Sequence, residues 1–185
     1  GNDVDSAWAA GCPFVVKGHP GHPGTCELQG LCVQDVIRSK NLPEGIFSLV
    51  QGTQNRVGEA LVQHPSIRAI GFTGSLRGGK SLWALTQKRT EPIPFFAELG
   101  SLNPTLAFPA IFRRNTSDFT KNLLASLTIG NGQMCTRPGF VFYVKCRETG
   151  QWTQELLTAA SLAPQQPLLN TSVASQFAEA TEQCR

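Results

Sequence analysis

The 185-residue sequence contains little charge, and the charge it has is nearly balanced. Charged residues make up 16% of the chain, hydrophobic residues 41%, and the formal net charge at pH 7 is +3. A surplus this small and scattered argues against the basic patches that bind nucleic acid or an anionic membrane surface. The composition is that of a globular chain long enough to bury a core. We therefore expect neither nucleic acid nor a membrane among its partners.

Long hydrophobic runs and targeting segments are also absent. The apolar runs are far shorter than the about 20 residues of a membrane-spanning helix. No positively charged stretch followed by an apolar segment opens the chain, so it shows no secretory signal. These features predict a cytoplasmic protein. The single methionine is Met134, so residue 1 is not a natural start. We expect the chain to be an internal segment of a longer protein.

Cysteine is not scarce, but its spacing fits neither a disulfide framework nor a metal site. The six cysteines are scattered and include no Cys-x-x-Cys pair. Their even number allows disulfides, although reduced thiols fit better in a long chain with a credible core. His19 and His22 have a spacing seen in metal pairs, but Pro20, Gly21 and Pro23 around them favour an ordinary loop. No metal site is expected.

Residues 1–98 alternate helix-like and strand-like segments. Strands are predicted at 13–17, 45–50, 67–72 and 94–98, and helices at 3–10, 26–40, 56–64 and 76–88, with Thr25 as a candidate cap. Such alternation predicts an α/β fold, a parallel Rossmann-like sheet with helices on both faces. Ligands bind beyond the carboxyl ends of the strands in such sheets. Lys17, Gly52, residues 72–75 and Glu98 all fall at these ends.

The pattern changes after residue 98, and the rest of the chain reads as the start of a second α/β domain. Strands are predicted at 105–108 and 140–144, and helices at 116–130, 151–160 and 171–183. Thr116 is a candidate helix cap. The helix that follows carries a core stripe of three leucines, Leu123, Leu124 and Leu127.

The thiol of Cys135 lies on a predicted tight loop. Residues 129–133, Ile-Gly-Asn-Gly-Gln, end the preceding helix in glycines, so Cys135 is expected outside the core. A catalytic thiol must be approachable and partly ionised, and the N–H groups of such a loop stabilise both a thiolate and an oxyanion. The loop alone leaves a buried structural cysteine as the alternative, since free cysteines are usually buried.

Three strand ends carry the other candidates. Glu98 ends an almost wholly apolar strand, so we expect a partly desolvated carboxylate suited to take a proton from water. The alternative is a strand-end acid that caps a nearby loop. Residues 72–75 lead into a helix, whose free N–H groups favour an anion such as pyrophosphate, or else Ser75 is only a helix cap. Lys17 is placed to hold a ribose or a phosphate.

Three of these stretches resemble motifs of the aldehyde dehydrogenase superfamily. The family reads Glu-Leu-Gly-Gly-x-(Ser/Asn)-Pro around its base, and residues 98–104 are Glu-Leu-Gly-Ser-Leu-Asn-Pro. Its Gly-Gln-x-Cys nucleophile motif is intact at 132–135, and its Gly-Ser turn matches residues 74–75. Like this chain, the family lacks the Gly-x-Gly-x-x-Gly sequence of ordinary Rossmann dehydrogenases. The likeness runs from about residue 9 to residue 142.

One subgroup of the superfamily is more similar still. Its Lys-Gly-His-Pro-x-His-Pro-Gly-Thr matches residues 17–25, and its Pro-Ile-Pro-x-Phe-x-Glu-Leu-Gly matches residues 92–100. It contains 2-oxoglutarate semialdehyde (2,5-dioxopentanoate) dehydrogenases and NADP-dependent fatty-aldehyde dehydrogenases. The chain departs from the family at Ser101, which replaces a glycine, and at Pro20, which replaces a ribose-binding glutamate. The family's oxyanion asparagine and its Glu-x-Phe-Gly-Pro motif are expected before residue 1 and after residue 185.

The resemblance implies NAD(P)-dependent oxidation of a small aldehyde to a carboxylic acid by a homodimer or homotetramer. Residues 1–98 would be a partial dinucleotide-binding domain, and residues 99–185 the N-terminal part of the catalytic domain. Cys135 would attack the aldehyde, its own N–H would support the oxyanion, and Glu98 would activate the water that hydrolyses the thioester. Contacts to NADP or NAD are expected from a larger set: Lys17, His19, Arg56, Gly58, Phe72, Thr73, Gly74, Ser75, Leu99 and Gly100.

Two other functional classes stay open. An acyltransferase on the same scaffold would pass the acyl group to coenzyme A, although Glu98 favours water. A truncated segment, catalytically inactive by itself, would act only as a binding or structural module. For the cofactor, Pro20 removes the repulsion of a 2′-phosphate, and Arg56 would pair with that phosphate unless it is only a solvated helix residue. We predict that NADP is accepted at least as well as NAD.

Overall fold

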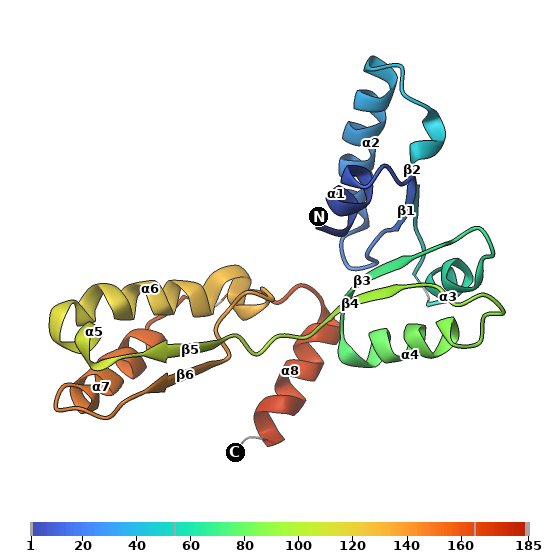
Figure 1. The fold of residues 1–185 in the computed structure, drawn as a ribbon. Coiled ribbons are helices and arrows are strands. Elements are labelled where there is room, and N and C mark those ends of the chain that lie inside the picture. The colour runs from blue at the N-terminus through green and yellow to red at the C-terminus, as the bar shows by residue number, and fades with distance from the viewer. Residues whose placement is uncertain (1, 54, 165, 184–185) are drawn as a thin grey trace. The chain divides into compact units, whose positions relative to one another are not determined.

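The computed structural model describes residues 2–53, 55–164 and 166–183, and the chain divides into two compact units. The first unit is Gly1–Leu99 and the second is Gly100–Arg185. Figure 1 shows the helices and strands of both. No helix among the described residues combines the length and the hydrophobicity needed to cross a membrane.

The first unit opens with a parallel strand pair and the helices around it. Helix α1 (Asn2–Ala9) precedes β1 (Phe14–Lys17), and α2 (Pro23–Ser39) and a 3-10 turn, η1 (Glu44–Ile46), lead to β2 (Phe47–Val50). The two strands pair in parallel. Gly30 lets α2 approach β2 closely, because a Cβ there would lie 2.8 Å from Leu49 Cδ2. The cap prediction for Thr25 is wrong, since α2 already begins at Pro23, whose fixed φ suits a first helical turn.

A second parallel pair completes this unit. Helix α3 (Arg56–Gln63) is followed by β3 (Ile70–Gly74), α4 (Leu76–Thr86) and β4 (Phe95–Leu99). Strand β3 starts later and ends later than predicted, because its ladder with β4 continues to the pair Gly74 and Leu99. Helix α4 packs on β4 at Gly79, where a Cβ would lie 2.2 Å from Leu99 Cδ2. That glycine therefore decides how close the helix comes to the strand.

In its described residues, the second unit contains one strand pair and five helices or helical turns. These are β5 (Pro104–Ala107), α5 (Pro109–Arg114), α6 (Thr116–Thr128), the 3-10 turn η2 (Ile129–Gly132), β6 (Phe140–Tyr143), α7 (Thr149–Ser161) and α8 (Thr171–Gln183). Strands β5 and β6 are parallel. Helix α5 was not predicted. The N-cap of α6 is Asn115 rather than Thr116, since the Asn115 side chain accepts the N–H of Asp118 at 3.3 Å.

The core of the second unit is built on aromatic rings. Trp152 is 2% exposed, and its ring lies 4.9 Å from that of Phe112 and 5.6 Å from that of Phe119. Leu123 is buried in this cluster and Leu127 packs beside it, as predicted, whereas Leu124 of the predicted stripe is only half-buried. The aromatic members were not foreseen, although Phe119 lies four residues before Leu123 on the same stripe of α6.

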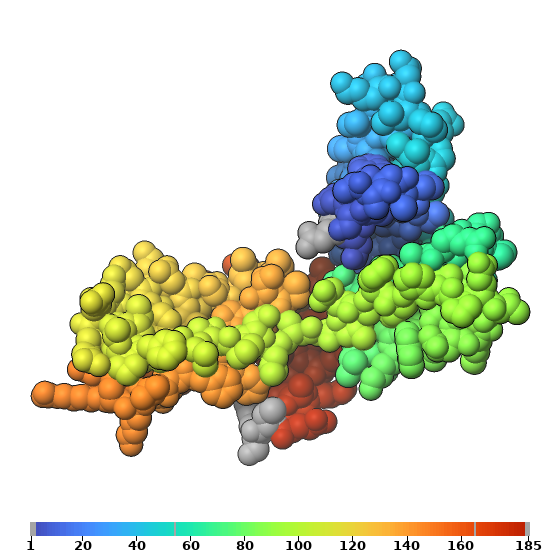
Figure 2. Space-filling model, viewed as in Figure 1, coloured from blue at the N-terminus to red at the C-terminus, as the bar shows by residue number. Residues whose placement is uncertain are grey.

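The expected α/β architecture with parallel strands is confirmed, but the pairing is more local than one continuous sheet. In the described residues the strands form three two-stranded sheets, β1–β2, β3–β4 and β5–β6. Large apolar side chains on the strands and their flanks stay exposed, including Leu106 and Phe108 at 66% and 65%. The segment 100–108, yellow-green in Figure 2, lies uncovered on the face shown there.

Candidate active site

The carboxyl end of the β1–β2 pair holds Lys17 and His19, as predicted. Lys17 is the half-buried last residue of β1, and the buried Gly18 donates its N–H to the carbonyl of Val50 at 2.8 Å. Gln51, directly after β2, was not foreseen. Its amide donates to the carbonyl of Pro23 at 3.2 Å and to the Glu27 carboxylate at 3.0 Å, so it fixes the loop after Lys17 to the start of α2. A polar residue directly after a predicted strand was the available signal.

His19 has a specific environment within that loop. Its Nδ1 accepts the N–H of Gly21 at 3.0 Å, and its ring stacks on that of His22 with 4.8 Å between centroids. Burial, then the charge of His22, then that of Lys17 hold the pKa of His19 below its ordinary value. The imidazole is therefore neutral near pH 7, and it offers a phosphate a hydrogen bond rather than a charge. In the residues described, no three potential ligands among His, Cys, Asp and Glu gather for a metal.

The carboxyl end of the β3–β4 pair brings four of the predicted residues together. Thr73 lies opposite Glu98 and Gly74 opposite Leu99 in the parallel register. The Phe72 ring covers Gly74, where a Cβ would lie 2.8 Å from Cζ, so a larger residue there would displace the ring. The expected desolvation of Glu98 is wrong within this unit, because its side chain is exposed. The register, not burial, brings the carboxylate to this edge.

Ser75 begins helix α4, and its hydroxyl has a local partner. Ser75 Oγ accepts the N–H of Gly78 at 3.1 Å, so the helix-cap interpretation of this serine is confirmed. The first turn of α4 contains no acidic residue that would repel an anion. A Gly-Ser entry of this kind keeps the helix N-terminus compatible with a phosphate group.

Arg56 and Gly58 lie in the first turn of α3. Arg56 is exposed and, among the described residues, forms no ion pair. A Cβ on Gly58 would meet only Leu82 Cδ2, at 3.9 Å, so the space beside it is open. The open space and the exposed guanidinium are compatible with a bound nucleotide, but they are equally compatible with a solvated helix end.

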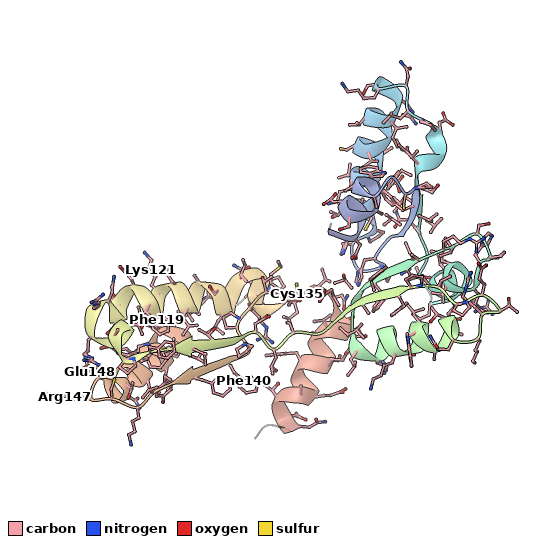
Figure 3. All side chains as sticks on the ribbon, viewed as in Figure 1. Phe119, Lys121, Cys135, Phe140, Arg147 and Glu148 are labelled. Carbon is pink, nitrogen blue, oxygen red and sulfur yellow. The ribbon has the colours of Figure 1, made fainter. Side chains whose placement is uncertain are left out.

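Cys135 is exposed on the turn that follows η2, as its glycine-rich surroundings predicted. Gly130, Asn131 and Gly132 have φ values of 57°, 56° and 74°, a left-handed run that ends the helix and turns the chain. Figure 3 shows Cys135 at the opposite end of the second unit from Arg147 and Glu148. That end holds the amino termini of β5 and β6.

Two side chains that were not singled out hold the residues around this thiol. Gln133 donates to the carbonyl of Gly130 at 2.9 Å and accepts the N–H of Leu169 at 2.8 Å. Asn103 donates through Nδ2 to the carbonyls of Cys135 and Arg137, at 2.6 Å and 2.8 Å. Beside this turn is a shallow hollow of about 390 Å³; it is lined by Gly130, Asn131, Gln133, Gln166, Pro167 and Leu169.

Comparison with known proteins decides the family. Residues 2–177 match the aldehyde dehydrogenase family. The chain belongs to the aldehyde dehydrogenase family. The resemblance drawn from the sequence motifs is therefore confirmed, and the match spans both units.

Individual aldehyde dehydrogenases show how much of such a protein this chain represents. It is 37% identical to α-ketoglutaric semialdehyde dehydrogenase 2 of Azospirillum brasilense, over 96% of this chain and 34% of that protein. It is 38% identical to the α-ketoglutaric semialdehyde dehydrogenase of Acinetobacter baylyi, over 96% of this chain and 33% of that protein. The chain thus spans about a third of the length of these curated relatives.

A solved structure shows the same fold. The NAD-dependent benzaldehyde dehydrogenase of Corynebacterium glutamicum superposes with a TM-score of 0.79 at 21% identity, over 97% of this chain and 39% of that one. At this level of sequence identity, the similarity shows only that the two chains share a fold. It agrees with the parallel α/β architecture described above.

Proposed function

We propose that this chain is the segment of an NAD(P)-dependent aldehyde dehydrogenase that carries the nucleophile and the general base. The observation that carries the proposal is the exposed Cys135, on a turn that places an intact family motif outside the core. The first unit would be the partial dinucleotide-binding domain, and the second the N-terminal part of the catalytic domain. The register that brings Glu98 to a strand end beside Thr73 supports the role of this carboxylate.

The proposed chemistry assigns one step to each side chain. The Cys135 thiolate attacks the aldehyde carbon, and the resulting oxyanion accepts a hydrogen bond from the Cys135 N–H. Bound NAD or NADP supplies the acceptor for the hydride that leaves this carbon, and a thioester on Cys135 is formed. Glu98 takes a proton from water, and the hydroxide displaces the thiol to release the carboxylic acid.

The residues present fit a dinucleotide at the strand ends of the first unit. The half-buried Lys17 supplies a cation, and the Gly74–Ser75 entry to α4 supplies N–H groups in a helical turn that contains no acidic residue. Arg56 supplies an exposed guanidinium for a 2′-phosphate. We therefore propose that NADP is used at least as well as NAD.

The substrate proposal follows from the names of the two relatives described above. Because both are named α-ketoglutaric semialdehyde dehydrogenases, we propose a small aldehyde that also carries a carboxylate, such as 2-oxoglutarate semialdehyde. We further propose a cytoplasmic homodimer or homotetramer. The free thiols of the described cysteines support a reducing compartment.

Replacing the thiol tests the proposal directly. In the complete protein that contains this chain, Cys135→Ala is expected to lower the rate of cofactor reduction by more than about 10³-fold, because no other group forms the thioester. Cys32→Ala, at an exposed thiol on α2, is the matched control and is expected to keep the rate. Binding of NADP, followed by fluorescence, is expected to survive both changes.

The same assay separates the competing classes. A Cys135→Ala protein that oxidises the aldehyde at an appreciable fraction of the normal rate would overturn the assignment. Acyl-coenzyme A, rather than the free acid, as the product in the presence of coenzyme A would identify an acyltransferase. A complete protein that binds NADP but oxidises no aldehyde would identify a binding module.

A further inference from the structure

The amino end of the β5–β6 pair has a proline on or just before each strand. The ladder begins where Pro104 lies opposite Phe140, and Pro138 lies just upstream on the other strand. Proline has no N–H, so Pro104 and Pro138 donate no backbone hydrogen bond here. One backbone bond remains, from the N–H of Gly139 to the carbonyl of Leu102 at 2.9 Å.

The side chain of Asn103 supplies two further hydrogen bonds at this end of the strand pair. Its backbone φ is 40°, a left-handed conformation that asparagine adopts more readily than most residues. From this position Nδ2 reaches the carbonyls of Cys135 at 2.6 Å and Arg137 at 2.8 Å. A single amide group thus fixes two carbonyls of the turn that carries the thiol.

The peptide groups on both sides of the Cys135 Cα are held in this way. The carbonyl of Met134, which shares a peptide plane with the Cys135 N–H, accepts the N–H of Arg137 at 3.3 Å. The carbonyl of Cys135 belongs to the following peptide plane and accepts Asn103. Because the two planes set φ and ψ of Cys135, they set the direction of its Cα–Cβ bond, from which the thiol extends. Among the described residues, the Cys135 thiol and N–H themselves make no hydrogen bond, so both remain available to a substrate.

We propose that Asn103 is the positioning residue of the Cys135 nucleophile. This inference rests on the proposed function, in which Cys135 forms the thioester. Asn103 touches neither aldehyde nor cofactor in that scheme. It orients the thiol, and through the turn it also orients the N–H that faces the oxyanion. A nucleophile that is misplaced by about 1 Å reacts on the order of 10²-fold more slowly.

Two substitutions separate the effect of the Asn103 side-chain amide from the effect of the backbone conformation at this position. Asn103→Asp keeps the shape and tolerates a positive φ, but it turns carboxylate oxygens toward two carbonyls. Asn103→Gly keeps the positive φ without strain and removes the side chain. If only the backbone mattered, the glycine variant would behave as the wild type. Asn122→Asp, at an exposed asparagine on α6, is the matched control for the added charge.

The readout is the first turnover of cofactor reduction, with NADP and aldehyde in excess over the complete enzyme, so that the amplitude counts the folded active sites. Both Asn103 variants are expected to lower the rate constant by about 10-fold to 100-fold while the amplitude stays complete, and to change NADP affinity by less than about twofold. Asn122→Asp is expected to match the wild type. A merely structural role would instead lower the amplitude, because fewer molecules would be folded, and leave the rate constant unchanged.

Cys135→Ala, measured in the same assay, distinguishes a failure of the proposed function from a failure of the role of Asn103. If this variant still transfers hydride, the proposed function itself is overturned. If it is inactive while both Asn103 variants keep the wild-type rate constant, or lose only amplitude, the nucleophile stands and the role of Asn103 is overturned.

Discussion

The two units place their candidate residues at opposite ends of their strands and by different means. In the first unit, Lys17 and Glu98 lie at the carboxyl ends of β1 and β4, where the parallel backbone ladder brings them. In the second unit, Cys135 lies at the amino ends of β5 and β6, where prolines lie at the start of the ladder. There, the side chain of Asn103 holds the backbone of the turn instead.

This difference has a physical origin. The carboxyl ends of parallel strands gather ligand-binding residues in any α/β sheet, so sequence order alone predicts that edge. A nucleophile needs a defined bond direction, and the prolines at this ladder end, which have no N–H, donate no backbone hydrogen bond that would fix it. The first unit therefore depends on topology to gather its residues, and the second on individual side-chain hydrogen bonds to orient one atom.

The largest expected effect concerns the base in the first unit. Glu98→Gln is expected to slow deacylation by about 10²-fold to 10⁴-fold, because the amide cannot take a proton from water. Hydride transfer is expected to be nearly unchanged, so a burst of reduced cofactor appears or grows in rapid-mixing measurements. If acylation were slowed as much as deacylation and no burst appeared, Glu98 would not be the base for hydrolysis. The strand ends of the first unit would then serve cofactor binding alone.

The next effect in size concerns cofactor choice in the same unit. Arg56→Ala is expected to reduce kcat/KM for NADP by an amount equivalent to about 1.5–3 kcal/mol, the value of a hydrogen bond to a charged group. NAD is expected to be unaffected, because it lacks the 2′-phosphate. Arg38→Ala, at an exposed arginine of α2 that pairs with Asp35, is the control. Equal losses for both cofactors, or a wild-type preference for NAD, would contradict this role of Arg56.

The smallest effect concerns the packing that supports Glu98. Gly79→Ala is expected to destabilise the protein by about 1 kcal/mol. Overpacking against Leu99 costs about 1–3 kcal/mol, and the gain in helix propensity offsets up to about 1 kcal/mol. Gly24→Ala, in the first turn of α2 with no atom within 4 Å of the new Cβ, is the control and is expected to be neutral or slightly stabilising. Urea unfolding of the purified protein measures the free energy of unfolding of both variants. Equal stabilities of the two variants would show that α4 moves freely on β4.

Local sequence patterns predicted most helices and strands. The predicted boundaries were wrong where a long-range strand partner or a competing helix cap decided where an element begins or ends. Strand β3 extends through Gly74 because β4 offers partners as far as Leu99. Helix α6 starts from the side chain of Asn115, whose advantage over Thr116 depends on the carbonyl and N–H geometry of the folded turn. The short helix α5 was missed because six residues contain too little periodicity to distinguish a helix from a loop.

The candidate site divides in the same way. Cys135, Glu98, Lys17 and the Gly74–Ser75 entry were found because each combines a reactive or anion-binding group with a recognisable backbone position. The roles of Gln51, Gln133 and Asn103 were not found. Each acts through hydrogen bonds to residues at least 24 positions away in the sequence, and no local pattern encodes such a partner.

The sequence by itself determined the family, the parallel α/β class and the exposure of the Cys135 thiol, because motif order, strand–helix alternation and glycine-rich turns are local properties. Only the tertiary structure decided the strand pairing, the exposure of Glu98 and the contact of Asn103 with the Cys135 turn. Strand register and side-chain reach depend on segments that meet only when the chain is folded. Hydrogen bonds act over only a few ångströms, so they form after folding has brought these segments into contact. They cannot be predicted from spacing along the chain.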